Sequence, residues 1–244
     1  MKKVISAIII GLAVVVAAVV LGNDYNFKFR QQKTISVTGG AKVSFASDLI
    51  VWKGSYSRKA STLEKAYAAL KTDKEKVQKF LSDKGGLDMG DVIFSAVDIS
   101  KNYQTEYNNN GKISSREFSG YTLTQKIKVQ SKEIAKVEKI SREITGLIQS
   151  GVEFNSLPPS YYYTQLASLK IDLLSKAAKD GRHRAETIAK ESESEIGTLK
   201  NADMGVFQII GQYSDENYTW GGAFNTSNKM KTASITVQME FLTK

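Results

Sequence analysis

YTLTQKIKVQ, residues 121–130, is the stretch that decides the fold, because its apolar and polar side chains alternate with a period of two residues. One face of the resulting strand carries Tyr121, Leu123, Ile127 and Val129, and the other carries Thr122, Thr124, Lys126 and Lys128. This pattern predicts a β-strand that is buried on one face and wet on the other. An antiparallel sheet is the usual setting for such a strand.

The residues just before this strand predict its partner. Asn108-Asn109-Asn110-Gly111 separates it from a long extended stretch over residues 91–107. Asn-Gly is the strongest short hairpin signal, because both residues tolerate a positive φ. We therefore expect residues 91–107 and the strand to form a β-hairpin.

Three segments around the hairpin have the three-and-four spacing of amphipathic helices. The first begins with a capping box at Ser61-Thr-Leu-Glu64 and ends at Gly85-Gly86. The second spans about residues 131–149 and stops at Gly151, and the third covers about residues 165–192. The apolar stripe of the first helix is Leu63, Tyr67, Leu70, Val77 and Leu81, and that of the third is Leu166, Leu169, Leu173, Ala177, Ala185 and Ile188.

Further strands are expected toward both ends of the chain. Ile35-Ser-Val37 opens one, Gly39-Gly40 then offers a turn or a bulge, and Leu49 to Tyr56 is rich in β-formers. Later in the chain, Met204 to Tyr213 predicts a buried strand, and residues 233–241 alternate strictly. Hairpins mixed with helices indicate an α+β fold, with helices packed on an antiparallel or mixed sheet.

The first 22 residues have the pattern of a membrane-targeting segment. Met1-Lys2-Lys3 precedes Val4 to Gly22, which contains no charged residue and would span about 28 Å as a helix, close to the thickness of a bilayer. A cleaved signal peptide usually has a shorter apolar run that ends in an Ala-x-Ala-like site. We therefore favour an uncleaved signal anchor, a single N-terminal transmembrane helix, and keep secretion after cleavage as the alternative.

An N-terminal signal of this kind normally exports the residues that follow it. Residues 23–244 are accordingly expected outside the cytoplasm, although Lys28, Arg30 and Lys33 pull the other way under the positive-inside rule. The expected division is an anchor over residues 1–22, a juxtamembrane linker over 23–32 and one domain over 33–244.

The composition excludes several kinds of chemistry. The chain has no cysteine, which excludes disulfides, thiolate metal sites and a cysteine nucleophile. His183 is the only histidine, so a zinc site or a Ser-His-Asp triad would depend on that one imidazole. We expect no enzymatic activity, no cofactor and no metal.

The charge of the exported part leaves two interpretations open. Without Lys2 and Lys3, 32 basic residues stand against 25 acidic ones, a net charge of +7. Such a charge favours anionic partners such as phospholipid heads or envelope polymers. The charges are dispersed and alternate with acids, so we favour solubility as their role. We expect no nucleic-acid partner, since the chain has no recognisable binding motif.

Three stretches together resemble the SIMPL-domain family, also called DUF541. They are Ile35-Ser-Val-Thr-Gly-Gly-Ala-Lys-Val43 followed by Asp48, then Ala178-Lys-Asp180-Gly-Arg-His-Arg184-Ala-Glu186-Thr-Ile-Ala189, and finally Ile196-Gly197. They resemble an opening "ISVTGxGxV…xD" strand, an "A-x-D-A-x-x-R-A-x-x-I/L-A" helix and an "LG" before the late strands. Their order and spacing cover nearly all of residues 33–242.

Two positions depart from the family pattern. Gly181 stands where the family often has alanine, and a glycine within a helix costs about 1 kcal/mol, so a bend is expected there. Glu193 stands where relatives often have a helix-ending glycine, so the helix is expected to end nearer Gly197.

The resemblance implies an α+β fold and a place in the bacterial cell envelope. Relatives include outer-membrane and periplasmic proteins, and some assemble into large rings. The family is linked loosely to oxidative-stress tolerance. It has no established catalytic residues, so none can be carried over to this chain.

Asp180, His183, Arg184 and Glu186 are the nearest approach to a catalytic cluster in the sequence. A hydrolase interpretation would make His183 a general base oriented by Asp180 or Glu186, three residues away on either side. Charged pairs at this spacing are routine on helix surfaces, so we favour a solvated helix face.

Aromatic residues supply the candidate interaction sites. Tyr161, Tyr162 and Tyr163 follow Pro158-Pro159 and would suit sugar stacking or an interface, although a half-buried start of a strand fits tyrosine equally. Trp220 lies in a Gly-rich loop and is expected to be exposed.

Two functions follow from these residues. The first is a non-catalytic, membrane-anchored envelope protein that assembles with itself or binds an unidentified partner. The second is a binding module for an anionic or glycan ligand of the envelope.

Overall fold

The computed structural model describes residues 11–19, which are helical, and residues 33–244. The chain forms two compact units. Among the residues from 33 onward, unit 1 comprises 33–40 with Ser175–Gly205 and Thr236–Lys244, and unit 2 comprises Ala41–Leu174 and Val206–Ile235. The expectation of one domain over residues 33–244 stays a prediction.

The expected membrane anchor falls largely outside the described residues, which omit 1–10 and 20–32. Within residues 11–19 and 33–244, no helix is long and apolar enough to cross a membrane. The anchor over residues 1–22 and the linker over 23–32 therefore stay predictions.

The main sheet of unit 2 is built on the strand that the sequence predicted. β5 (Ile113–Ser131) pairs antiparallel with β2 (Leu49–Ala60), from Ile50 opposite Ser131 to Ala60 opposite Tyr121. Leu123, Ile127 and Val129 are buried, which confirms the predicted face. β4 (Asp98–Tyr107) pairs antiparallel with β5 across the turn at residues 108–112, so the predicted hairpin is confirmed as well.

Shorter strands complete this six-stranded sheet, whose order is β3-β5-β2-β6, with β4 also on β5 and β7 also on β2. They are β3 (Val92–Phe94), β6 (Phe154–Ser156) and β7 (Ser160–Tyr162). Trp52 and Tyr56 of β2 lie fully within the core of this unit.

Helix α2 (Leu63–Lys79) packs on this sheet and continues as a π-helical turn over Phe80–Lys84. The capping residue is Thr62 and not Ser61, because the Thr62 side chain accepts a hydrogen bond from the Lys65 amide. Leu70, Val77 and Leu81 are buried as predicted, whereas the first turn is more open and Tyr67 is exposed.

Helix α3 (Ile134–Glu143) is followed by a 3₁₀ helix over Ile144–Ser150. The tighter helix ends at Gly151, whose φ of 76° is the left-handed conformation that favours glycine. Val137, Ile140, Ile144 and Leu147 are buried against the same core.

A second sheet has the order β1-β10-β8, with β9 on β10. Its strands are β1 (Thr34–Ala46), β8 (Ile196–Met204), β9 (Gln208–Gly211) and β10 (Met230–Thr243). The alternation of β10 is confirmed by burial of Ala233, Ile235, Val237, Met239 and Phe241. The buried strand expected from Met204 to Tyr213 is confirmed only over the four residues of β9. Met204 and Tyr213, the two ends of the expected strand, are both exposed.

Helix α4 (Leu166–Glu191) is the third predicted helix. In unit 1 its inward stripe consists of small residues, Ala177, Gly181, Ala185 and Ala189. A Cβ added at Gly39 of β1 would lie 2.2 Å from the Ala177 carbonyl oxygen and 2.4 Å from the Gly181 amide nitrogen. Of the turn or bulge predicted at Gly39-Gly40, the turn is therefore wrong, because β1 continues through both residues. Gly39 lets the helix approach the strand.

The end of α4 differs from the expectation at Glu193, whereas the bend expected at Gly181 stays a prediction. The helix continues through Gly181 to Glu191 without interruption. Glu193 adopts a φ of 53°, and the amides of Glu193 and Ser194 donate to the carbonyls of Lys190 and Ala189. These are the two hydrogen bonds of a Schellman motif, so Glu193 occupies the left-handed position usually taken by glycine and the helix does not extend toward Gly197.

Candidate interaction site

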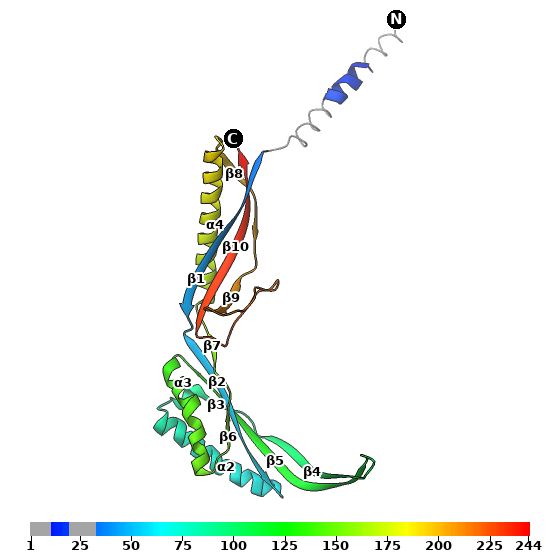
Figure 1. The fold of residues 1–244 in the computed structure, drawn as a ribbon, viewed down its shortest axis with the longest axis vertical. Helices are drawn as coiled ribbons and strands as arrows, with labels where there is room; N and C mark the ends of the chain where they lie inside the picture. Colours follow the sequence, from blue (N-terminus) through cyan, green and yellow to red (C-terminus); the bar gives the residue numbers. More distant parts are fainter. Residues whose placement is uncertain (1–10, 20–32) are drawn as a thin grey trace. The chain divides into compact units, whose positions relative to one another are not determined.

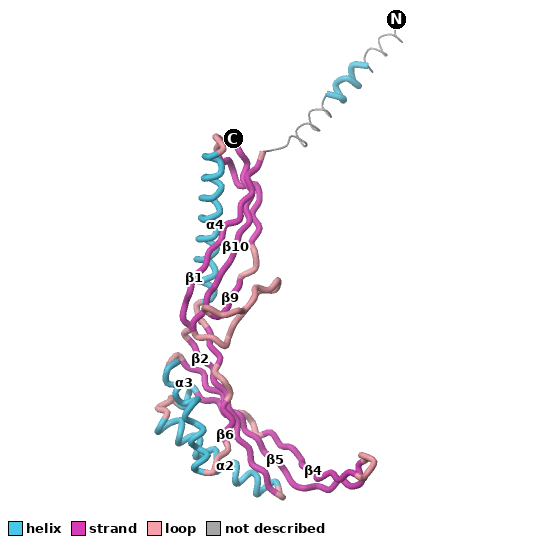
Figure 2. The backbone as a smooth tube through the Cα atoms, viewed as in Figure 1, coloured by secondary structure: helices cyan, strands magenta, loops and turns pink. Residues whose placement is uncertain are grey.

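A loop of residues 212–229 joins β9 to β10 (Figure 2). It carries the two most exposed aromatic side chains of unit 2 and is here called the aromatic loop. Trp220 is 100% exposed and Tyr213 is 96% exposed, and Tyr218 and Phe224 are about half exposed. The predicted exposure of Trp220 is confirmed. Aromatic side chains displayed in this way suit recognition, because each offers a large apolar surface at a small entropic cost.

Gln208 of β9 ties down the middle of the aromatic loop. Its Nε2 donates to the Thr219 carbonyl at 2.8 Å, and its Oε1 accepts from the Ala223 amide at 2.7 Å. The Ile209 amide donates to the Ala223 carbonyl, and the Asn225 amide donates to the Ile209 carbonyl. Trp220 thus projects from a segment that is hydrogen-bonded on both sides.

Glu216 fixes the first half of the loop from within. Its Oε2 accepts from the Gly211 amide at 2.9 Å, and its Oε1 accepts from the side-chain amide of Asn225, which is buried. The Gly211 N–H and then the Asn225 amide lower the pKa of Glu216 below its usual value. The carboxylate is therefore charged while it holds the loop.

Lys231, the second residue of β10, lies beneath this network with only 2% of its surface exposed. Its Nζ donates to the Tyr161 carbonyl oxygen at 2.5 Å. Burial lowers the pKa of Lys231, and the negative charge of Glu216 opposes that effect. A lysine buried to this degree is uncommon unless it is paired, so its position indicates a specific structural role.

Of the three consecutive tyrosines 161–163, Tyr161 is hydrogen-bonded to the aromatic loop. The Tyr161 amide donates to the Thr226 carbonyl at 2.7 Å, and the Tyr161 hydroxyl donates to Glu138 Oε1 at 3.0 Å. All three tyrosines are half-buried, and the Tyr163 ring lies 4.8 Å from that of Phe45. The structure therefore joins Tyr161 to the loop that carries Trp220, while Tyr162 and Tyr163 belong to the half-buried segment around β7.

Lys231 was missed by sequence reasoning although a signal was present. It lies two residues before Ala233, in phase with the buried positions of the alternating strand. That phase alone predicts an inward-pointing ammonium group.

The Asp180 cluster links α4 to β1 within unit 1. Asp180 Oδ2 accepts from the Gly40 amide and from Arg184 Nε, each at 2.9 Å, and Arg182 pairs with Glu186 at 2.8 Å. Both ion pairs join residues four positions apart. The expected pairing of His183 with a carboxylate three positions away is not among them. The Gly40 N–H is the main cause that lowers the pKa of Asp180. His183 is exposed.

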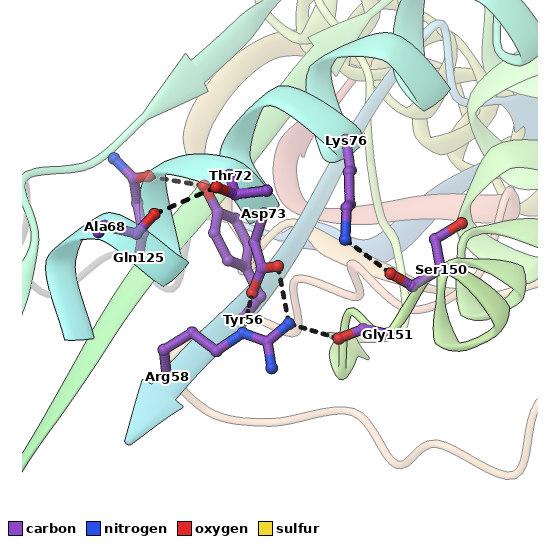
Figure 3. Close-up of polar contacts among 9 residues, drawn as sticks. All are labelled: Tyr56, Arg58, Ala68, Thr72, Asp73, Lys76, Gln125, Ser150 and Gly151. Atoms are coloured by element: carbon purple, nitrogen blue, oxygen red, sulfur yellow. Dashed lines mark hydrogen bonds and ion pairs between the residues drawn. The ribbon is translucent and has the colours of Figure 1, made fainter. Parts of the chain in front are cut away.

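A further ion pair, which the sequence did not predict, joins α2 to β2 (Figure 3). Arg58 reaches both oxygens of Asp73, at 2.5 Å from Nε and 2.8 Å from a terminal nitrogen, and it also donates to the Gly151 carbonyl. Asp73 is 1% exposed. Nearby, the Tyr56 hydroxyl donates to Gln125 Oε1 at 2.6 Å, and burial raises the pKa of Tyr56.

These polar groups are engaged in hydrogen bonds and ion pairs within the fold. Among residues 11–19 and 33–244, no group of three or more His, Cys, Asp or Glu side chains is placed to hold a metal ion. The aromatic loop is therefore the strongest candidate for a functional surface.

Comparison with known proteins gives one family. The family model SIMPL, described as a protein of unknown function (DUF541), matches residues 35–241. That range contains all three stretches on which the resemblance was based. A search of curated proteins finds no match.

Proposed function

Because the chain belongs to the SIMPL (DUF541) family, whose function is unknown, we propose that it is a non-catalytic, membrane-anchored envelope protein that assembles with itself or binds a protein partner. Residues 1–22 would anchor it in the bacterial cytoplasmic membrane by a single pass, with residues 33–244 facing the periplasm or exterior. Secretion to the periplasm after cleavage is the alternative. A contribution to oxidative-stress tolerance rests on the resemblance alone.

One observation carries the proposal, namely full exposure of Trp220 on a loop that is held in place. Tryptophan and tyrosine are enriched among the residues that dominate binding energy at protein interfaces. Gln208 and Glu216 hold the loop by hydrogen bonds on either side of Trp220. A loop that is already ordered loses less conformational entropy on binding than a free one.

The test compares the molar mass of the full chain with that of Trp220→Ala, in mild detergent, by light scattering behind size exclusion. We expect a defined oligomer for the natural chain and a smaller species for Trp220→Ala. Tyr67→Ala is the matched control, because Tyr67 is an exposed aromatic residue on α2 outside the loop. A monomeric natural chain that also captures no partner on crosslinking in membranes would refute the proposal.

A ligand-binding module is the second candidate, favoured by the same exposed aromatics together with the +7 charge of the exported part. Its ligand would be an anionic or glycan component of the envelope. Binding of the monomeric chain to cell-wall fragments, with loss of that binding in Trp220→Ala, would select this function over assembly. Binding that is equal in the two chains would exclude the loop as the glycan site.

A further inference from the structure

The hairpin of β4 and β5 extends beyond the strands and helices that cover the rest of its sheet (Figure 1). β2 pairs with β5 only from Tyr121 to Ser131, whereas β4 follows β5 outward to the pair of Tyr107 and Ile113. We call residues 98–121 the aromatic hairpin. A two-stranded hairpin is only marginally stable by itself in water, so its side chains must supply part of the stability.

The register of the hairpin separates its two faces by chemistry. One face carries the pairs Tyr107 and Ile113, Thr105 and Arg116, Tyr103 and Phe118, Lys101 and Tyr121, and Ile99 and Leu123. The other face carries Asp98, Ser100, Asn102, Gln104 and Glu106 of β4, opposite Thr124, Thr122, Gly120, Glu117 and Ser115 of β5. The first face is apolar and aromatic, and the second is polar.

Side-chain contacts confirm that the aromatic residues share one face. The Tyr103 and Phe118 rings are 5.9 Å apart, and the Phe118 and Tyr121 rings are 5.1 Å apart. The guanidinium carbon of Arg116 lies 4.4 Å from the centre of the Tyr103 ring. These four residues therefore form a continuous ladder of side chains along the face.

This face continues the core side of the sheet but has no cover within the described chain. Leu123, on the same face nearer the helices, is fully buried. In contrast Ile99, Tyr103, Tyr107, Ile113 and Phe118 are 43–65% exposed. Five neighbouring exposed apolar residues are more than the scattered exposure that is normal on a soluble surface, and such patches mark interaction sites.

The charges on the hairpin indicate what covers this face. Lys101 and Arg116 are its charged residues, and both are cationic, whereas Asp98, Glu106 and Glu117 lie on the opposite face. The face therefore complements a negatively charged partner. Isoleucine can neither stack on a sugar nor donate a side-chain hydrogen bond to it. The two exposed isoleucines therefore favour a partner that also has an apolar hydrocarbon region.

We propose that the aromatic hairpin binds the surface of an anionic lipid bilayer with this face. Ile99, Tyr107 and Ile113 would enter the boundary between headgroups and acyl chains, where amphipathic aromatic residues concentrate. Lys101 and Arg116 would lie at the level of the lipid phosphates, where each cation contributes to binding. The proposal uses residues separate from the aromatic loop and does not rest on the function proposed for that loop.

The test exploits the absence of cysteine from the chain, which allows a dye to be attached at one chosen position. Ile113→Cys places an environment-sensitive NBD dye on the apolar face, and Gln104→Cys places it on the polar face as the matched control. The full chain is reconstituted in phosphatidylcholine bilayers, and vesicles of phosphatidylglycerol or of phosphatidylcholine are then added. The signal comes from the molecules whose hairpin faces outward, because only these meet the added vesicles.

With phosphatidylglycerol vesicles we expect a blue-shifted, brighter dye at position 113 that brominated lipids quench, and no change at position 104. Lys101→Gln combined with Arg116→Gln should weaken the binding about 30-fold, from the usual contribution of a cation near an anionic surface. Circular dichroism checks that each variant is folded.

Several results would overturn the proposal. They are an unchanged dye at position 113, equal changes at both positions, or equal binding to neutral vesicles. A dye response that depends on protein concentration and not on lipid would assign the face to a second copy of the chain. A response to an anionic polysaccharide without one to vesicles would assign it to a glycan.

Discussion

The two units attach helices to sheets in opposite ways. In unit 2, large side chains fill the space between α2 and the sheet, among them Trp52, Leu70 and Val77. In unit 1, α4 lies so close to β1 that only small residues fit, and Gly39 touches Gly181. A helix thus packs on a sheet in both units, through large side chains in unit 2 and through small residues in unit 1. Removal of volume should damage the first interface, and addition of volume should damage the second.

Each interface also has one carboxylate that ties helix to strand. Asp73 is buried and holds the Arg58 side chain, whereas Asp180 accepts a hydrogen bond from the backbone amide of Gly40 and stays accessible to water. A buried charge leaves an uncompensated partner when it is removed, and an exposed one is replaced by solvent. The two tethers should therefore differ in strength.

Gly39→Ala should have the largest effect, because the new Cβ would meet backbone atoms of α4 that cannot move aside. We expect a loss of about 3 kcal/mol or more in the free energy of unfolding, at the upper end of overpacking effects. Urea unfolding followed by circular dichroism measures it. Gly146→Ala is the control, since a Cβ there meets nothing within 4 Å. A Gly39→Ala protein as stable as this control would disprove the close-packing account.

Asp73→Ala should rank second. Removal of one partner of a buried pair commonly costs about 3–5 kcal/mol, but the Arg58 side chain is 34% exposed and can regain water. We therefore expect a loss of about 2–3 kcal/mol, measured from urea unfolding by tryptophan fluorescence, which changes when the buried Trp52 becomes exposed. Glu75→Ala, at an exposed position of the same helix, should change little. Equal losses in these two variants would mean that the tether does not matter.

Glu193→Gly should raise stability by about 0.5–1 kcal/mol, because glycine adopts the left-handed conformation at this position without strain. Thermal unfolding measures the gain. Glu193→Ala separates conformation from charge, since alanine removes the carboxylate but keeps the Cβ. The explanation fails if alanine stabilises the protein as much as glycine does.

Asp180→Asn should have the smallest effect, and that effect should depend on pH. The lowered pKa of Asp180 means that the folded protein prefers the charged carboxylate. The resulting stability is present above the ordinary pKa near 4 and is lost as the pH falls through the lowered value. The natural chain should thus exceed the variant in stability at neutral pH, and the difference should fade in acid. A difference that is constant from neutral to acid pH would contradict this role.

The interfaces also differ in how far the sequence predicted them. The alternation of β5 and β10 and the Asn-Gly turn predicted those strands correctly, because side-chain period and turn chemistry are local properties. The stripe of α2 was visible for the same reason. Asp73 was hidden, since it lies in the run of charges from Lys71 to Lys79 and its partner is 15 residues away.

The contact between Gly39 and α4 was misinterpreted, because a glycine in a sequence can indicate either a turn or a close approach of two backbones. Gly39-Gly40 indicates a turn by composition, and the close approach to α4 involves residues about 140 positions away. β8 was missed for another reason: most of its residues are exposed, so it lacks the apolar alternation that marks a strand. Thr62 took the capping role from its neighbour Ser61, a shift of one residue that cap signals alone do not resolve.

Of the candidate site, the exposure of Trp220 was predictable, because Gly-rich polar loops lie at the surface. The network beneath it was not, since Gln208, Glu216 and Lys231 come from separate stretches of the chain. The aromatic face of the hairpin was likewise hidden until the register aligned Tyr103 with Phe118.

The position of β10 between β1 and β8 has a consequence for the order in which the chain can fold on the ribosome. β10 follows every other strand of its sheet in the sequence, so β1 emerges about 200 residues before the strand that it must pair with. Until then, β1 and β8 lack the strand that pairs with both of them. The close contact between β1 and α4 also lacks the support of a complete sheet. Pairing over such a separation is intrinsically slow, because the loop must be closed before any contact stabilises it. The second sheet is therefore completed only after residues 230–243 have been translated, and a nascent chain that stops short of them cannot hold β1 in place.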